Sequence, residues 1–147
     1  LKAAIPRGHS VFAEWCYATH SIRYSALPDF LLVIAAREDF SGQWLSWSGT
    51  ARLAAGLGIP AVPELWRGTP MDQNALRAAS DRVALSTSEC GGDREGLVVR
   101  LAGPFKELPK SMAKWVRAGH VTTDEHWTRA KIEKNALAIR YSGMPVQ

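Results

Sequence analysis

Three short segments of the chain each place a charged side chain within an apolar, strand-forming run. In chain order, these side chains are Glu14, Glu95 and Lys114. Burying an isolated carboxylate or ammonium group is costly, so such insertions indicate either mutual ion pairing or a shared polar ligand. Cations suit phosphate groups, while carboxylates suit sugar hydroxyls and divalent metal ions. A nucleotide would satisfy all three side chains.

The elements that would position these side chains are predicted strands. Residues 10–17 are rich in aromatic and β-branched side chains, and residues 30–36 form a continuous apolar run that predicts a central strand buried on both faces. Residues 95–101 predict a third strand after a glycine-rich turn. Alternation along that strand would place Glu95 on one face and Arg100 on the other.

Two helices are predicted between these strands. Residues 48–57 have helical spacing with Ser48 as a candidate N-cap, and residues 72–85 show a second helical pattern. Residues 123–125 would cap a further helix that begins near His126. Because strands alternate irregularly with helices, we predict an α+β fold rather than a doubly wound parallel sheet.

Composition limits the class of protein. The chain has 147 residues, 46% hydrophobic and 22% charged, which is ordinary for one soluble globular domain. Its formal net charge of +4 is compatible with a polyanionic partner. No apolar run reaches the length of a membrane span, so no membrane partner is predicted. Cys16 and Cys90 lack metal-site spacing, and we interpret them as reduced thiols of a cytoplasmic protein.

In this order, the charged segments resemble the ATP-dependent RNA ligase family, members of the covalent nucleotidyltransferases that also include DNA ligases and capping enzymes. Residues 14–22 (EWCYATHSI) resemble the family's G-E-W-x-Y-A-x-H-S-I segment. Residues 95–100 (EGLVVR) match its E-G-x-V-x-[KR] motif, and residues 114–120 resemble its last nucleotide-binding motif. The resemblance implies a nucleotidyltransferase (ATP-grasp-like) core of mainly antiparallel sheets with flanking helices.

The resemblance also implies a three-step reaction and its cofactors. A lysine attacks the α-phosphate of ATP, AMP passes to an RNA 5′-phosphate, and a 3′-hydroxyl then displaces AMP; Mg²⁺ or Mn²⁺ assists. By this analogy Glu14 would bind the ribose hydroxyls, Glu95 would position the metal and Lys114 would contact the α-phosphate. Ile34 would contact the base. The expected partners are ATP and RNA ends, with these additional candidate RNA or phosphate contacts: Arg100 and Arg117.

The sequence departs from the family pattern in several places. No K-x-D-G nucleophile motif occurs in residues 1–147, and Lys2 fits nothing. We therefore expect a partial domain, truncated at its N-terminus, that cannot adenylate itself. Ala13 stands where relatives have glycine, and Ile34 and Ala35 stand where relatives have an aromatic residue and an acid. Val116 occupies the place of a second basic residue, for which Arg117 would substitute.

Simpler interpretations stay open for each of these residues. Glu14 would form a cross-strand ion pair, and Lys114 would be a solvated lysine that covers an aromatic ring. Arg100 and Arg117 would by default be solvated, and the histidines would be packing residues. The six tryptophans would occupy core or rim positions, with RNA stacking as the alternative. For the whole chain, the alternatives are a non-catalytic nucleotide- or RNA-binding module and a DNA ligase or capping-type nucleotidyltransferase.

Overall fold

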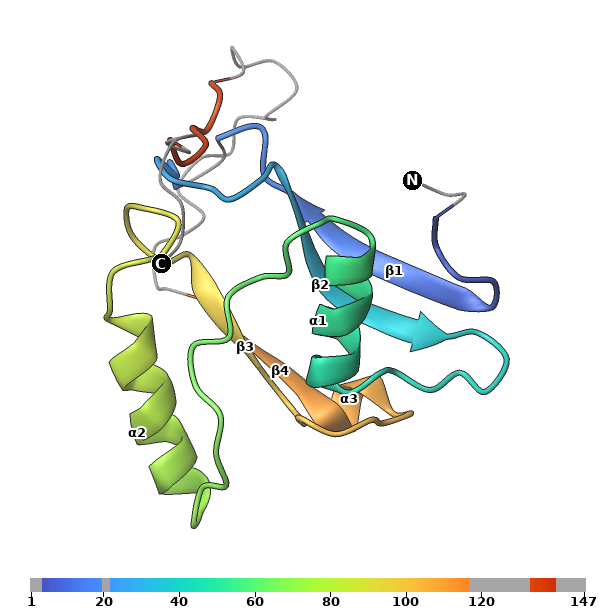
Figure 1. Cartoon of the computed structure of the whole chain (residues 1–147). Helices are drawn as coiled ribbons and strands as arrows, with labels where there is room; N and C mark the ends of the chain where they lie inside the picture. Colours follow the sequence, from blue (N-terminus) through green and yellow to red (C-terminus); the bar gives the residue numbers. More distant parts are fainter. Residues whose placement is uncertain (1–3, 20–21, 117–132, 140–147) are drawn as a thin grey trace, which may run out of the picture.

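The computed structural model describes residues 4–19, 22–116 and 133–139. Its elements follow the order β1 (His9–Trp15), β2 (Leu31–Glu38), α1 (Trp47–Gly56), α2 (Gln73–Ala84), β3 (Gly96–Arg100), α3 (Leu108–Ser111) and β4 (Met112–Val116) (Figure 1). The strands form two antiparallel pairs, β1–β2 and β3–β4. This arrangement confirms the predicted α+β class.

The β1–β2 pair contains a bulge that determines which side chains share a face. Phe12 pairs with Ala35 and Ala13 pairs with Val33, so Ile34 is the extra residue. Val33 packs on the side of α1, whereas Leu32 points to the opposite face, into a cluster with Leu27 and Cys90. The prediction that this strand is buried on both faces is wrong at Ile34, which is 39% exposed.

The second edge of β2 is also hydrogen-bonded. The backbone N–H of Val33 donates to Pro60 (2.9 Å), and the carbonyl of Val33 accepts from Val62 (2.9 Å). Farther along the strand, Leu45 donates to Ala36 (2.9 Å). Among the described residues, β2 therefore has β1 on one edge and only isolated bridges on the other, so it belongs to a two-stranded sheet rather than forming the predicted central strand.

Both long helices begin at a side-chain cap. Asp72 caps α2 by accepting from the backbone N–H of Ala75 (2.8 Å), as its place in the sequence indicates. The cap of α1 is Ser46, whose Oγ accepts from Gly49 (3.0 Å). Ser48 was therefore the wrong candidate, because it lies inside the first helical turn. The helix expected near residue 126 falls outside the described residues.

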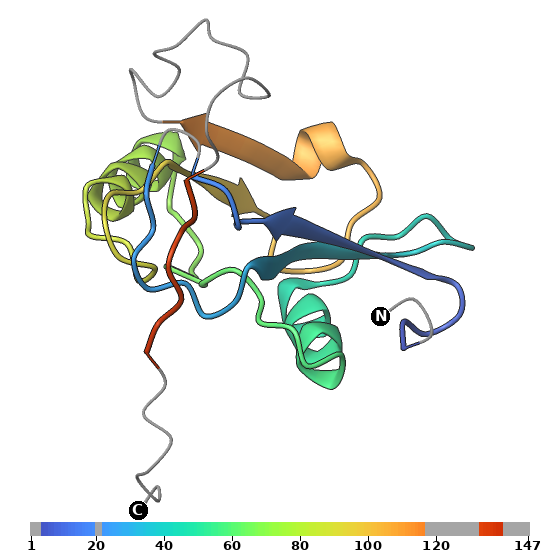
Figure 2. The ribbon, with the colours of Figure 1, turned by 90° about the horizontal axis from the view of Figure 1, so that it is seen from above.

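The two strand pairs lie in different layers. Figure 2 shows α1 on one side of β1–β2 and the β3–β4 pair on the other. Trp44 and Phe105 connect the layers: Trp44 donates to the carbonyl of Phe105 (2.8 Å) and accepts from its N–H (3.3 Å). Their rings stack with centroids 6.3 Å apart, and Phe12 of β1 packs against Trp44 at 4.9 Å. This aromatic contact joins the strand pairs at one end.

Residues 133–139 run alongside the chain that follows β1. Thr19 donates to the carbonyl of Glu133 (2.7 Å), and Leu27 donates to that of Ala136 (3.0 Å). The segment is the red-orange stretch beside the blue loop in Figure 2. In the part of the chain that the structure describes, no helix is both long and apolar enough to cross a bilayer.

Candidate functional site

Glu14 lies on the face of β1–β2 that α1 does not cover. Its pairing partner is Leu32, and side chains of directly opposed residues share a face. Ile34 is the extra residue of the bulge, so the strand register does not assign its side chain to this face. Both Glu14 and Ile34 are exposed. The structure therefore places both residues on paired strands, and only Glu14 is assigned by its register to the face that α1 does not cover.

The thiol of Cys16 indicates how Glu14 and Glu95 are placed. Burial raises the pKa of the Cys16 thiol to about 11, and the charges of Glu14, Cys90 and Glu95 add to this rise in that order. Two carboxylates from distant parts of the sequence thus lie within electrostatic range of one sulfur atom. Glu14 and Glu95 are therefore the two candidate acids in the neighbourhood of Cys16.

Tyr24 contacts the same region. Burial raises its pKa to about 12, the charge of Glu95 raises it further, and a hydrogen bond from the Glu95 backbone acts in the opposite direction. Tyr24 and Cys16 both pack against the core cluster of Leu27, Leu32 and Cys90. The backbone hydrogen bond to Tyr24 therefore places Glu95 near this core.

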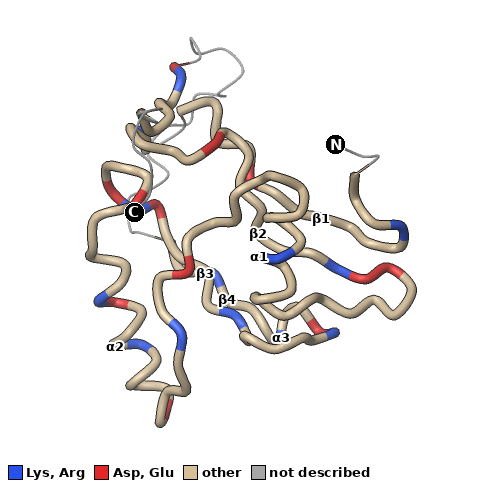
Figure 3. Tube along the Cα trace, viewed as in Figure 1, with Lys and Arg blue, Asp and Glu red and all other residues tan. Residues whose placement is uncertain are grey.

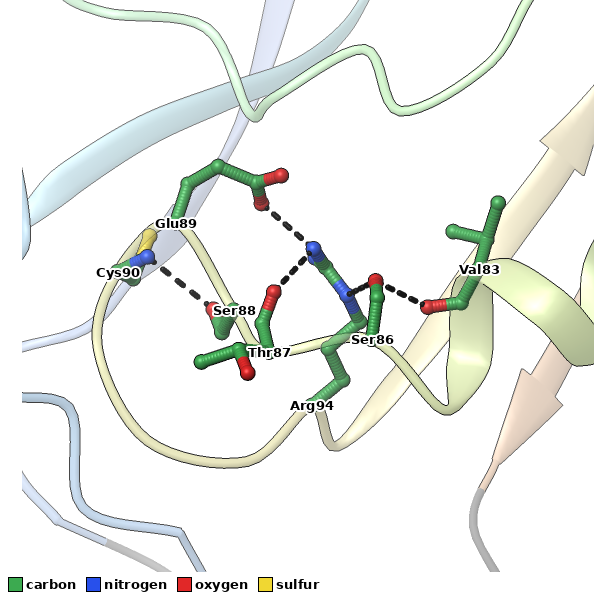
Figure 4. A network of polar contacts seen from close by, with 7 residues as sticks. All are labelled: Val83, Ser86, Thr87, Ser88, Glu89, Cys90 and Arg94. Carbon is green, nitrogen blue, oxygen red and sulfur yellow. Dashed lines mark hydrogen bonds and ion pairs between the residues drawn. The ribbon is translucent and has the colours of Figure 1, made fainter.

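Arg94 holds the loop that leads into Glu95 (Figure 4). Its guanidinium, 7% exposed, donates to the carbonyl of Thr87 (2.8 Å), to Glu89 (2.8 Å) and to Ser86 Oγ (3.2 Å). These hydrogen bonds compensate the buried charge of Arg94 and connect the two ends of the loop of residues 86–94. The sequence analysis missed this role, although the Ser-Thr-Ser-Glu run before two glycines was an available signal.

Gly96 explains why glycine follows Glu95. A Cβ atom at this position would overlap the carbonyl oxygen of Trp115 and would lie 3.2 Å from the Cα of Val116. Both neighbours are backbone atoms of β4, which cannot move without separating the strands. Only glycine permits the two strands to approach this closely next to Glu95.

Lys114 lies on the β3–β4 pair. It pairs with Val98, and Arg100 pairs with Met112, so Lys114 and Arg100 share one face of this pair. Leu97 and its partner belong to the other face. The structure therefore places Lys114 with Arg100, on a different strand pair from Glu14, whereas Glu14 and Glu95 both lie within electrostatic range of Cys16.

Arg100 is packed rather than solvated. Its guanidinium lies 5.6 Å from the ring centroid of Trp47 and 5.2 Å from that of Phe105, and Nη2 donates to the carbonyl of Leu45 (2.8 Å). Burial lowers its pKa from the ordinary value of 12.5. Its Nη1 is buried and has no hydrogen-bond partner among the described residues. These contacts tie β3 to the segment that precedes α1.

Charged residues of both signs occur throughout the part of the chain that the structure describes (Figure 3). Blue and red segments alternate along the trace in Figure 3, in agreement with the modest net charge of +4. Both cysteines are free thiols. Several predicted residues lie outside the described part of the chain: Arg117, His20, His120 and His126.

The carboxylates of the candidate site could bind a divalent metal ion only together with phosphate groups of a bound molecule. In residues 4–19, 22–116 and 133–139, no group of three or more His, Cys, Asp or Glu side chains could hold a metal ion. Mg²⁺ commonly binds through one or two carboxylates together with substrate phosphates. A single carboxylate such as that of Glu95 could take part in that mode only if a bound molecule supplied the phosphate ligands.

Three further residues beside this site carried no clear sequence signal. Asn135 is 3% exposed, and both its amide oxygen and its amide nitrogen are hydrogen-bonded. Lys134 lies against two aromatic rings, and Trp15 is exposed. Their importance depends on partners that are distant in the sequence. Local spacing therefore could not identify them.

The fold and the grouped acids define an α+β protein with a candidate polar-ligand site built on elements of two antiparallel strand pairs. Residues 2–116 match the family model described as RNA ligase. Because this match covers more than half of the chain, the protein belongs to the RNA ligase family, which confirms the resemblance. Comparison with curated proteins and with solved structures gives no match.

Proposed function

We propose that this protein acts as an ATP-dependent RNA ligase, which joins strands through lysyl-AMP and adenylylated 5′-phosphate intermediates on a nucleotidyltransferase core. Membership of the RNA ligase family supports the substrate class. The observation that carries the proposal for the site is that the charges of Glu14 and Glu95 both act on the Cys16 thiol, which packs against the core cluster of Leu27, Leu32 and Cys90. Two acids beside one core are suited to a ligand that offers both sugar hydroxyls and a metal-bound phosphate.

Glu14 and Ile34 would bind the nucleoside. The exposed Glu14 carboxylate would accept hydrogen bonds from the ribose hydroxyls, and Ile34 would contact the adenine face. Their exposure on two paired strands supports this pairing of roles. An aliphatic side chain supplies dispersion contact without aromatic stacking, so we expect weaker base selectivity than an aromatic ring would give.

Glu95 and Lys114 would act on the phosphates. Glu95 would help hold Mg²⁺ or Mn²⁺, which when bound neutralises negative charge on the phosphoryl oxygens. Lys114 would contact the α-phosphate and stabilise charge that develops during transfer. This role requires the Lys114 face of β3–β4 to approach the Glu14 face of β1–β2 when nucleotide binds. Arg100 would orient β3 through its contacts with Trp47 and Phe105. We also propose that Arg100 and Arg117 contact RNA.

The third step of the reaction gives the sharpest experiment, because it needs no lysine nucleophile. The RNA 3′-oxygen forms a bond to the 5′-phosphorus of adenylylated RNA, the 3′-hydroxyl loses its proton, and AMP leaves with the electron pair of the cleaved P–O bond. We expect the 147-residue chain to seal pre-adenylylated RNA in the presence of Mg²⁺ and to form no covalent AMP adduct with labelled ATP.

Variants separate the site from the fold. Glu95→Gln should abolish sealing, and Glu14→Gln should weaken ATP binding in calorimetry; Glu64→Gln, at an exposed surface pair with Arg67, is the matched control. A chain that binds no ATP and seals no adenylylated RNA would contradict the proposal. An AMP adduct on any lysine would contradict the predicted lack of self-adenylation. Parallel assays on DNA ends and capped RNA test the other nucleotidyltransferase substrates.

A non-catalytic nucleotide- or RNA-binding module is the second candidate. Ala35, where relatives have an acid, is 4% exposed and offers no functional group, and Ile34 replaces the aromatic residue. ATP or RNA binding without sealing of adenylylated RNA, under conditions in which the chain is folded, would favour the module. Sealing that depends on Glu95 would exclude it.

A further inference from the structure

An exposed pair of aromatic rings lies at the end of β1. The side chain of Trp15 is 62% exposed, and its ring stacks on Tyr17 with centroids 6.1 Å apart and planes at 17°. A tryptophan this exposed leaves a large apolar surface in water, and its flat outer face is the shape that a nucleobase stacks on. Surfaces of this kind commonly mark interaction sites.

Contacts of Tyr17 with Phe30 and Lys134 hold the Trp15–Tyr17 pair in place. The edge of Phe30 packs against Tyr17, with centroids 5.1 Å apart and planes at 67°. Lys134 Nζ lies 5.2 Å from the Tyr17 ring and 5.1 Å from the Phe30 ring. The Tyr17 carbonyl accepts from the backbone N–H of Asn135 (2.9 Å). A preorganised surface loses little conformational entropy when a ligand binds.

The position of this surface separates it from the candidate nucleotide site. Trp15 follows Glu14 directly, so alternation along β1 places the two side chains on opposite faces. Trp15 pairs with Leu31, whereas Glu14 pairs with Leu32 on the face grouped around Cys16. A ligand on Trp15 therefore does not compete with a nucleotide beside Glu14.

We propose that Trp15, Tyr17 and Lys134 form an aromatic platform that binds an unpaired base of single-stranded RNA. The exposed Trp15 face stacks on the base, and the Lys134 ammonium supplies positive charge that complements the phosphate backbone. The choice of RNA as partner rests on the proposed ligase function. Stacking tolerates any base, so the platform would hold a strand end of any sequence.

Binding of a labelled single-stranded oligoadenylate of about ten nucleotides, followed by fluorescence anisotropy, tests the platform. We expect Trp15→Ala and Trp15→Leu each to weaken binding about tenfold and Trp15→Phe to retain most of the affinity. The matched control is Trp66→Ala, because Trp66 is 48% exposed and lies after α1, and it should bind as the parent protein does. Lys134→Gln should lower the salt dependence of binding by about one ion.

A second oligonucleotide distinguishes stacking from charge. An abasic strand of equal length keeps the phosphates and removes the bases, so it should bind weakly and should not respond to Trp15→Ala. Equal affinities of the parent protein, Trp15→Ala and Trp15→Leu, equal binding of the abasic strand, or no RNA binding by the parent protein would overturn the platform. Trp15-dependent RNA binding in a protein that binds no ATP would contradict the proposed ligase function and leave the platform standing.

Discussion

The side-chain oxygen of Asn135 accepts a hydrogen bond from the backbone N–H of Tyr24 at 2.8 Å. The same oxygen accepts from Thr19 Oγ1 (3.0 Å), and Nδ2 donates to the carbonyls of Cys16 (3.0 Å) and Ala18 (3.2 Å). One buried amide thus uses two acceptor and two donor positions. Through these bonds, residues 133–139 are joined to the loop that follows β1.

Asn135→Ala should lower the free energy of unfolding by about 3 kcal/mol, because buried backbone groups lose their partners. Asn135→Asp should destabilise similarly, since a carboxylate cannot donate to the two carbonyls. Urea unfolding followed by circular dichroism measures both changes. Asn74→Ala, on the exposed surface of α2, is the control. Equal unfolding midpoints for the parent protein and both Asn135 variants would show that the amide contributes little to stability.

Arg94→Met should loosen residues 86–94 and lower stability by about 2 kcal/mol, because the Thr87 carbonyl and the Glu89 carboxylate lose a charged donor. Since Glu95 follows directly, ATP affinity should also fall. Hydrogen exchange of this loop and calorimetry measure the two effects. Arg52→Met, at an exposed position of α1, should change neither. Unchanged exchange of residues 86–94 in Arg94→Met would contradict the anchoring role.

The sequence predicts elements well where local pattern determines them. The apolar run at residues 30–36 predicts β2, and Asp72 predicts the start of α2, since the cap contact spans only three residues. The α+β class follows from the same patterns. The bulge at Ile34 could not be predicted, because alternation alone contains no signal for an extra residue whose partner strand lies elsewhere in the sequence.

The candidate site was predictable in part for a related reason. Glu14 and Glu95 stand out as acids within apolar runs, and both lie within electrostatic range of Cys16. The buried roles of Arg94 and Asn135 depend on where other backbone carbonyls lie in space, which residue types do not reveal. Placement of Lys114 depends on how β3–β4 sits relative to β1–β2, a relationship determined by loops rather than by strand patterns.

Gly96→Ala should disrupt the pairing of β3 with β4, because the added methyl group would overlap the Trp115 carbonyl oxygen. Overpacking of this kind costs about 1–3 kcal/mol, and the damage lies beside Glu95. We therefore expect a lower unfolding midpoint together with weaker ATP binding. Gly103→Ala is the matched control, since its Cβ would meet nothing within 4 Å. If both variants behaved alike, close strand approach would not explain the glycine.

Alkaline pH should destabilise the fold, because the buried thiols of Cys16 and Cys90 and the phenol of Tyr24 lose their protons. Burial raises the pKa of Cys16 from 9.0 to about 11 and that of Tyr24 from 10.0 to about 12, and it raises the pKa of Cys90 as well. Each group is neutral when protonated, and the folded state favours that neutral form. The stability from Cys16 is therefore fully present below about pH 9 and is lost as the pH rises through about 11.

Urea unfolding at about pH 8, 9.5 and 11 measures this loss. The contribution of these three groups keeps the urea midpoint of unfolding constant up to about pH 9, and the midpoint should then fall. Cys16→Ala should flatten the fall between about pH 9 and 11, whereas the Tyr24 contribution is lost later, between about pH 10 and 12, because both of its pKa values are higher. A fall of equal size in Cys16→Ala would assign the alkaline transition to other groups, since a thiol that is absent cannot release a proton.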